Sequence, residues 1–569
     1  MVQYEFFLSS ALEKVFPHRR PTALGADTAV SCWKGHKCAV QLVYTAQNGA
    51  PNMPVQEYQV EVSGAPGKVV LRSVELMPAK LPCYENSDDD YISKIPGLFP
   101  DLLQEREDGL VLPLPRQYRS LWITFHISAD TPAGNYPVVI HAKPCCHKPQ
   151  PNGTAFHDPE AEAQVFALPF TLKVGKAQLP PQQLLHTEWF HTDCLATYYQ
   201  VDVFSEEYWR ITENFIASAA EHGVNMLLTP VFTPPLDTPV GKERPTVQLL
   251  DIFVEGDAYR FDYNNLHRWV NLCKKYSITH LEIPHLFTQW GAVATPKIMA
   301  HVDGRLKRIF GWDVSAGSWE YRNFLLQFLP SLRAELEKLG FDNDHVYYHI
   351  SDEPSAEHAD AFLTALKQTE GILDECHVFD ALTSFDFFQK GLVKTPVVAN
   401  DYIQPFFEAN VSNLWVYYCC VQGDLVPNRF FSMESRRNRI MGVLMFLYNV
   451  EGFLQWGFNF YNAKYSIYPI DPFRCTDGDY GWPAGDPFLV YPGAGGHPLT
   501  SIRAEVQDDA LLDLRSLRLL ESLAGRDYVI RLIHQTAGTN MLSFKDYPRN
   551  NAFLLNLREL VASEIEARL

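Results

Sequence analysis

Alternating apolar and polar residues mark the first 180 residues of the chain. In SLWITFHISAD (120–130), every second residue from Leu121 to Ile127 is apolar, which predicts a half-buried strand. A turn-forming TPAGNY and a second strand-like run, PVVIHAK (137–143), follow, and the alternation returns in QVFALPFTLKVGK (164–176). Short strands with Pro- and Gly-rich connections predict a β-sandwich domain over residues 1–180.

The pattern changes after KAQLPPQQ (176–183). Pro180 and Pro181 exclude a helix there and favour an extended linker. Beyond the linker, apolar strand-like runs alternate with amphipathic helical stretches, which is typical of parallel α/β architecture.

Eight candidate strands can be distinguished in this second part. They are TEWFHT (187–192), NMLLTP (225–230), ITHLEIPHLF (278–287), VYYHISDEP (346–354), HVFDALTS (377–384), TPVVAN (395–400), NLWVYYCC (413–420) and FLQWGFNFY (453–461). Eight strand–helix units predict a (β/α)8 barrel of the TIM type over residues 181–525. A doubly wound open sheet is the alternative, and the count of eight favours the barrel.

Helical segments separate most of these strands. Residues 205–223 begin with a Ser cap and end at His-Gly, and residues 321–340 repeat this form. Apolar residues at helical spacing over 500–523 predict the last barrel helix. Residues 526–569 are predicted to form a C-terminal helical extension packed on the barrel.

The charge balance argues against a nucleic-acid partner. The net charge is −19, from 67 acidic and 48 basic residues, whereas a phosphate backbone requires clustered Lys and Arg. The one dense basic segment contains Arg436, Arg437 and Arg439, and we interpret it as a helix N-terminal region or an anion contact. Aromatic residues make up 13% of the chain, which suits a sugar-binding cleft as well as a core.

Neither the cysteines nor the apolar runs indicate secretion or a membrane. The 11 cysteines are scattered, without the spacing of a disulfide framework or a zinc site. The N-terminus lacks a basic region followed by a sustained apolar one, and the longest apolar run, 440–450, is too short to span a bilayer. We expect a cytoplasmic protein with no membrane partner; the sequence does not indicate its oligomeric state.

The segment YYHISDEPSAEH (347–358) places two carboxylates, Asp352 and Glu353, side by side at the predicted end of the fourth strand. Adjacent like charges at the rim of a core are unfavourable, and the ends of barrel strands are where catalytic groups gather. The alternative is a helix start, in which Asp caps, Glu complements the dipole and Pro occupies the first turn.

Paired carboxylates suit glycoside cleavage, which uses one protonated and one charged carboxyl group. A charged Asp352 would raise the pKa of Glu353 and keep it protonated as the acid. Two-carboxylate glycosidases usually place these groups on different strands. Adjacent carboxylates instead suit substrate-assisted hydrolysis, in which the 2-acetamido oxygen of the sugar is the nucleophile.

Seven segments resemble glycoside hydrolase family 123 and its DUF4091 relatives. They are HTEWFHTDCLATYY (186–199), TPPLDTPVGKERPTVQL (233–249), HLFTQWGAVATPKI (285–298), HISDEPS (349–355), LWVYYCC (414–420), GFLQWGFNFY (452–461) and the block from GDPFLVYPG to VQDD (485–509). The resemblance covers residues 120 to 520. It implies a β-sandwich and a barrel, an oligosaccharide or glycoconjugate substrate, and retaining β-N-acetylgalactosaminidase activity without a metal or cofactor. It also implies that Asp352 holds the acetamido group and that Glu353 is the general acid/base.

One block departs from the family pattern. The C-terminal block reads VQDDALLDL (506–514), without the glycine and tyrosine that the family often has, although Asp508 and Asp513 are possible equivalents of its acidic residues. Two other hypotheses therefore stay open. One is a glycosidase for a different sugar, and the other is a non-catalytic carbohydrate-binding protein.

The first strand carries His186, Glu188, His191 and Asp193. Such residues ligate metals in other proteins, but no HxxxH or HExxH spacing occurs here. Glu188, His191 and Asp193 are candidates for contacts with substrate hydroxyls, and structural roles are the alternative.

Further substrate-binding candidates end other strands. Gln289 and Trp290 follow the third strand, and Trp290 could stack on a sugar face. Tyr417 on the seventh strand is a candidate donor to the acetamide oxygen. Trp456 and Asn459 end the eighth strand. The alternative for Trp290 is packing within its loop, and for Trp456 it is packing in the core.

Overall fold

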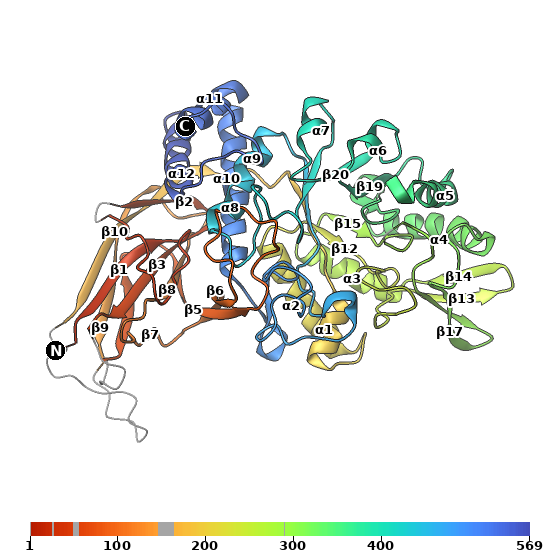
Figure 1. Ribbon diagram of the computed structural model, residues 1–569, viewed down its shortest axis with the longest axis horizontal. Coiled ribbons are helices and arrows are strands. Elements are labelled where there is room, and N and C mark those ends of the chain that lie inside the picture. Colours follow the sequence, from red (N-terminus) through yellow and green to blue (C-terminus); the bar gives the residue numbers. More distant parts are fainter. Residues whose placement is uncertain (1, 26–27, 49–55, 146–163, 290, 355) are drawn as a thin grey trace, which may run out of the picture.

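The computed structural model shows a β-rich N-terminal part beside a barrel surrounded by helices (Figure 1). The residues that it describes are 2–25, 28–48, 56–145, 164–289, 291–354 and 356–569.

Two five-stranded sheets form the N-terminal part. The first has the strand order β1 (Tyr4–Ser10), β3 (Lys37–Ala46), β8 (Arg119–His126), β5 (Lys68–Ala79) and β6 (Gly97–Glu105). The second has the order β2 (Ala29–Lys34), β10 (Phe166–Gln178), β9 (Gly134–Pro144), β4 (Tyr58–Ser63) and β7 (Leu110–Val111). Leu42 and Ile123 from the first sheet share a buried cluster with Ile140 and Leu172 from the second. The predicted β-sandwich is confirmed.

Strand β8 corrects one expectation. The alternation predicted a half-buried strand, but its residues from Ser120 to Phe125 are all buried. Ile123 faces the sandwich core, whereas Trp122, on the other face, belongs to the large cluster that also contains the barrel helices. The second face is buried because the sandwich packs against the barrel, which alternation within one strand does not reveal.

The barrel is closed and parallel. Its strands are, in order, β11 (Leu185–Glu188), β12 (Met226–Leu228), β15 (His280–Ile283), β18 (Val346–Tyr348), β19 (His377–Leu382), β20 (Thr395–Ala399), β21 (Trp415–Tyr417) and β22 (Gly452–Gln455). Strand β22 pairs in parallel with β11 and closes the ring. Every one of these strands lies within or overlaps a predicted segment, so the barrel is confirmed and the open sheet is excluded.

Helices connect the barrel strands. They are α1 (Thr192–Tyr199), α2 (Glu206–Glu221), α3 (Asn264–Lys275), α4 (Trp319–Lys338), α5 (Ala359–Thr369), α6 (Phe385–Gln389), α7 (Gln404–Glu408), α8 (Ser435–Arg439), α9 (Met441–Leu447) and α10 (Ile502–Ala524). The predicted cap at Ser205 is present, since its side chain accepts a hydrogen bond from the backbone N–H of Tyr208 at 3.2 Å. Gly223, with φ of 76°, follows the end of α2 in the left-handed region that glycine adopts without strain.

Two barrel loops carry an additional sheet that the sequence did not predict. Its strands have the order β14 (Ala258–Asp262), β13 (Asp251–Glu255), β16 (Ile298–Val302) and β17 (Arg305–Phe310). The hairpin β13–β14 follows β12, and the hairpin β16–β17 follows β15. The loops after the second and third barrel strands are therefore held to each other by strand pairing.

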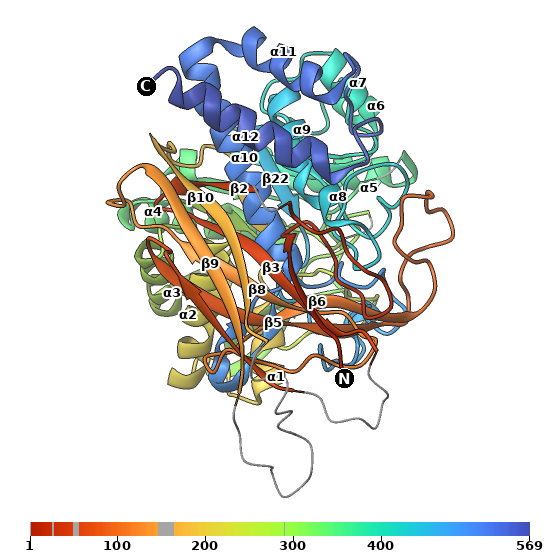
Figure 2. The ribbon, with the colours of Figure 1, turned by 90° about the vertical axis from the view of Figure 1, so that its left-hand side faces the viewer.

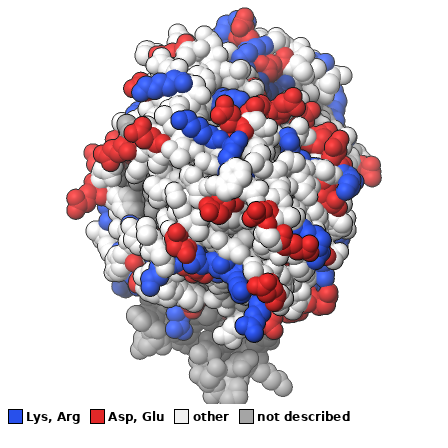
Figure 3. Space-filling view, turned by 90° about the vertical axis from the view of Figure 1, so that its right-hand side faces the viewer, with Lys and Arg blue, Asp and Glu red and all other residues white. Residues whose placement is uncertain are grey.

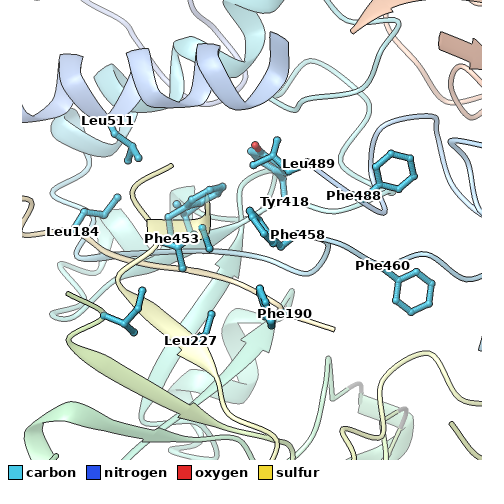
Figure 4. Close-up of a cluster of buried hydrophobic side chains, with 14 of the residues drawn as sticks. Leu184, Phe190, Leu227, Tyr418, Phe453, Phe458, Phe460, Phe488, Leu489 and Leu511 are labelled. Atoms are coloured by element: carbon cyan, nitrogen blue, oxygen red, sulfur yellow. The ribbon is translucent and has the colours of Figure 1, made fainter. Parts of the chain in front are cut away.

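Helix α10 joins the two halves of the molecule. Its Leu511 belongs to the same large buried cluster as Phe453 of β22, and both are drawn in Figure 4. On its other side Arg503 forms a buried ion pair with Asp101 of β6, with Nε and Oδ1 2.8 Å apart. Helices α11 (Arg526–Ala537) and α12 (Asn551–Glu566) follow, and α12 crosses beside α10 and the strands β2 and β10 (Figure 2). The final helix thus contacts the sandwich as well as the barrel helices.

The basic segment of α8 is used inside the molecule. Arg437 pairs with Asp88 at 2.9 Å, and Arg439 pairs with Asp513 at 2.8 Å. Over the face opposite the sandwich, acidic and basic side chains are interspersed (Figure 3). Within the described ranges, none of the helices combines the length and apolarity needed to cross a membrane.

Candidate active site

A cavity of about 150 Å³ opens at the C-terminal ends of the barrel strands. It is lined by Trp189, His191, Leu236, Asp237, Gln289, Asp352, Glu353, Ala381, Tyr417, Tyr418, Cys419, Cys420, Leu454, Trp456, Phe460 and Trp482. A larger cavity of about 820 Å³ lies at the opposite end, against the strand starts at His280, Tyr347 and Trp415. Barrel enzymes place their chemistry at the C-terminal ends of the strands, so the smaller cavity is the candidate site.

Asp352 and Glu353 line this cavity, four and five residues after the end of β18. The side-chain amide of Gln289 donates to Asp352 Oδ2 at 3.5 Å, and the Tyr417 hydroxyl donates to Glu353 Oε1. Glu353 has a φ of 45°, a left-handed conformation that costs a non-glycine residue about 1–3 kcal/mol. The surrounding loops therefore hold the Glu353 carboxyl group in place against a local conformational cost.

Burial raises the pKa of both carboxyl groups. Burial, and then the neighbouring charge of Glu353, raise the pKa of Asp352 to about 8. Burial also raises the pKa of Glu353, and the Tyr417 hydrogen bond opposes this. The sequence analysis predicted that Glu353 holds the proton. The pKa of Asp352 is raised as well, first by burial and then because two neighbouring carboxyl groups cannot both be charged without repulsion.

A buried imidazolium lies beneath the pair. His349 Nε2 lies 2.6 Å from Glu282 Oε1, and its Nδ1 lies 3.5 Å from Asp380 Oδ1. Burial alone would lower its pKa, but the bonds to Asp380 and Glu282 raise it to about 9. The positive charge of His349 in turn lowers the pKa of Asp352, which limits the cost of ionising the pair.

His191 is held as a neutral ring. Arg244, which has no acceptor, donates from Nη2 to His191 Nδ1 at 3.2 Å, so His191 Nε2–H donates to the carbonyl of Trp456 at 2.9 Å. Burial, and then the charge of Arg244, lower the pKa of His191 to about 3. Asp193 accepts two hydrogen bonds from Arg244, at 2.7 and 2.8 Å, and so fixes the guanidinium.

Aromatic rings form one wall of the cavity. The ring centroids of Trp456 and Trp482 are 4.9 Å apart, and those of Phe460 and Trp482 are 5.5 Å apart. The indole N–H of Trp456 donates to Asp486 Oδ2 at 2.8 Å, which fixes the orientation of the ring. An aromatic wall opposite polar groups provides ring faces on which a sugar ring can stack.

The structure brings together six of the predicted site residues. His191, Gln289, Asp352, Glu353, Tyr417 and Trp456 all line the cavity. Trp290 lies outside the described residues. The side chains of Glu188, Asp193 and Asn459 do not line the cavity.

These three side chains lie in the wall behind the cavity. Glu188 is fully buried and receives two hydrogen bonds of 2.9 Å from Arg429. Asn459 bonds to the backbone of His191, accepting from its N–H at 2.8 Å. In the described part of the chain, no three His, Cys, Asp or Glu side chains are grouped as a metal site would require.

The altered C-terminal block lies away from the cavity. Asp508 pairs with His222 at 3.0 Å and with Lys37 at 2.8 Å, and Asp513 pairs with Arg439. Both aspartates belong to α10 and hold it to its neighbours. The block therefore does not contact the cavity through these carboxylates.

The sequence analysis did not single out the charged groups around Asp352 and Glu353. Glu282 and Asp380 are carboxylates inside apolar strands, and His349 lies three residues before Asp352. A charged residue in a buried strand is itself a signal, because it must be paired there. Asp237 had no such signal, since it lies in a long loop whose path the sequence does not indicate.

Comparison with known proteins identifies the catalytic part. The sequence profile of the catalytic domain of glycoside hydrolase 123 matches residues 189–520, more than half of the chain. No curated protein matches the sequence.

One solved structure shares the fold. A family 123 glycoside hydrolase from Clostridium perfringens, described in a study of glycolipid glycan hydrolysis, is similar with a TM-score of 0.70 and 14% identity, over 99% of this chain and 97% of that chain. A β-glucuronidase from Ruminococcus gnavus matches with a TM-score of 0.28 and 8% identity, over 89% of this chain and 98% of that chain.

Proposed function

Because the chain belongs to the glycoside hydrolase 123 family and is a glycosidase by that membership, we propose that it removes terminal β-linked N-acetylgalactosamine from glycans. The observation that carries this proposal is the adjacent pair Asp352 and Glu353, both with a pKa raised by burial, in a cavity with an aromatic wall. The C. perfringens relative is described in terms of glycolipid glycans, which makes such glycans the first substrates to test.

We propose substrate-assisted hydrolysis with retention of configuration. The acetamido oxygen at C2 of the sugar attacks C1 while Glu353 gives its proton to the departing glycosidic oxygen. Asp352 accepts the amide N–H and stabilises the positive charge that develops on the resulting oxazolinium ring. Water then attacks C1, Glu353 removes its proton, and the ring opens to the free sugar.

The proton of the pair must be on Glu353 when the substrate is bound. An amide N–H that donates to Asp352 favours its charged form, so binding moves the shared proton to Glu353. The hydrogen bond from Tyr417 holds the Glu353 carboxyl group in position. In this mechanism His349 remains positively charged beneath both groups.

Asp352→Asn separates this mechanism from its alternatives. With nitrophenyl β-N-acetylgalactosaminide we expect a loss in kcat of about 10²–10³-fold, because the oxazolinium loses its anionic partner. With a nitrophenyl galactoside, which has no acetamido group, the variant should act as the wild type does. An equal loss on both substrates would contradict substrate assistance. Retention is checked by following the anomeric proton of the first-formed sugar by NMR.

A further inference from the structure

A third carboxylate faces the cavity from a different part of the barrel. Asp237 lies in the loop between β12 and β13 and lines the same cavity as Asp352 and Glu353. It is half-buried, with a φ of 44°. Non-glycine residues in this region are strained, and such strain is concentrated at functional sites.

The carboxylate of Asp237 is not neutralised by a nearby base. Arg244 and, more weakly, Lys464 lower its pKa, but Arg244 is already bound to Asp193, to His191 and to the carbonyl of Leu236. Among the described residues, no Lys, Arg or His side chain forms an ion pair with Asp237. Burial raises its pKa to about 6, so the group is mostly charged at neutral pH.

The position of Asp237 in the ring of strands places it across the cavity from the pair. Asp237 Oδ2 accepts a hydrogen bond of 3.1 Å from the backbone N–H of Ser466, in the segment after β22. In the closed order of eight strands, β12, which precedes Asp237, is the second, β22 is the eighth, and β18, which precedes the pair, is the fourth. A residue that joins the loops after the second and eighth strands lies over the first strand, β11, on the side of the ring away from the fourth.

This placement matches the far side of a sugar ring. If Asp352 and Glu353 hold the ring at C2 and C1, the opposite side of the ring presents C4 and its hydroxyl group. A charged carboxylate that is partly removed from water accepts a hydroxyl hydrogen bond more strongly than a neutral group does. A site built for such a hydroxyl rejects a sugar that lacks it or presents it differently.

We propose that Asp237 is the specificity-determining residue for the C4 hydroxyl of the terminal sugar. The inference rests on the proposed function, because it assumes that the pair holds C1 and C2. It goes beyond that function by assigning the choice between axial and equatorial C4 hydroxyls to a residue outside the catalytic pair.

The test combines a change in the enzyme with a change in the substrate. Wild type and Asp237→Asn are compared on nitrophenyl β-N-acetylgalactosaminide and on its 4-deoxy form. Asparagine still accepts the Ser466 N–H, so the loop keeps its anchor. We expect each change alone to lower kcat/KM by about 10²-fold, and both together to lower it little further. We also expect Asp237→Asn to reduce the preference for the galacto over the gluco substrate.

Losses that multiply would overturn the proposal, because they would mean that Asp237 and the C4 hydroxyl act independently. Asp257→Asn, the same change of charge in the exposed β13–β14 turn, is the matched control and should leave kcat/KM unchanged. If Asp237→Asn does not fold, Asp237→Ser, which also retains an acceptor, replaces it. Failure of the wild type to cleave any β-linked acetamido sugar would refute the proposed function, whereas turnover without the coupling refutes only the role of Asp237.

Discussion

The Tyr417 hydroxyl donates a hydrogen bond to the Glu353 carboxyl group, although the two residues come from different parts of the barrel. Tyr417 ends β21, and Glu353 follows β18 by five residues. Only closure of the barrel brings the two together. This contact positions the proposed acid and opposes the rise in its pKa that burial causes.

Tyr417→Phe should therefore shift the pH dependence of catalysis. The hydrogen bond favours the charged form of Glu353, so its loss raises the pKa of Glu353 further. We expect the alkaline limb of the kcat profile to move to higher pH, with kcat reduced about tenfold through lost positioning. A fall in kcat at every pH without a shift of the limb would mean that Tyr417 acts on the substrate instead.

Protonation of His349 should stabilise the fold. Its pKa in the folded protein, about 9, lies above the ordinary value of about 6.5. The stabilisation is complete below about pH 6.5 and is lost as the pH rises through 9; this difference corresponds to roughly 3 kcal/mol. Denaturant unfolding at both ends of this range measures it. His349→Gln should be less stable and should lose most of this pH dependence, and an unchanged dependence would contradict the assignment.

Glu188→Gln should affect stability rather than substrate affinity. The change leaves Arg429 charged and buried without its carboxylate partner, which costs about 3–5 kcal/mol. Burial would raise the pKa of Glu188, but Arg429 and then His186 lower it to about 2. The stability from this pair is therefore present above about pH 4.3 and lost as the pH falls towards 2.

The control for Glu188 is Glu206→Gln. Glu206 pairs with Arg268 at the surface, with 85% of its side chain exposed, and solvent screening leaves such a pair little effect on stability. The folded Glu188 variant should keep the KM of the wild type. A raised KM with unchanged unfolding would instead support direct contact between Glu188 and the substrate.

The sandwich and the barrel should unfold together. Asp101 of the sandwich pairs with Arg503 of α10, and both side chains are at most 2% exposed. Asp101→Asn should lower the free energy of unfolding by about 3 kcal/mol. The exposed pair of Glu61 and Lys143 provides the control, since Glu61→Gln should have little effect. A second unfolding transition in Asp101→Asn, with the barrel unaffected, would show that the two parts are independent.

The sequence indicated the elements better than their contacts. Apolar runs bounded by turn residues identified all eight barrel strands, because a parallel strand buried on both faces reads as a continuous apolar run. The burial of Trp122 on the outer face of β8 was not predictable, since it depends on how the sandwich packs against α10. Pairing between separate segments leaves no local signal.

The same limit applies to the site. Asp352 and Glu353 were identifiable because adjacent carboxylates after an apolar run are unusual. Glu188 looked like a substrate ligand, and only the position of Arg429, which lies far along the chain, shows that it has a buried partner. Asp237 could not be singled out, because its place in the cavity is set by loop packing.

Release of nitrophenol from nitrophenyl β-N-acetylgalactosaminide, by the wild type and by Glu353→Gln, tests the central claim most directly. We expect turnover by the wild type and a loss of about 10²–10⁴-fold in the variant, with normal folding of both. The loss should be smaller for leaving groups that need no protonation. Turnover that Glu353→Gln retains in full would contradict the assignment of Glu353 as the acid. A folded wild type that cleaves neither this substrate nor its gluco counterpart would contradict the proposed substrate class.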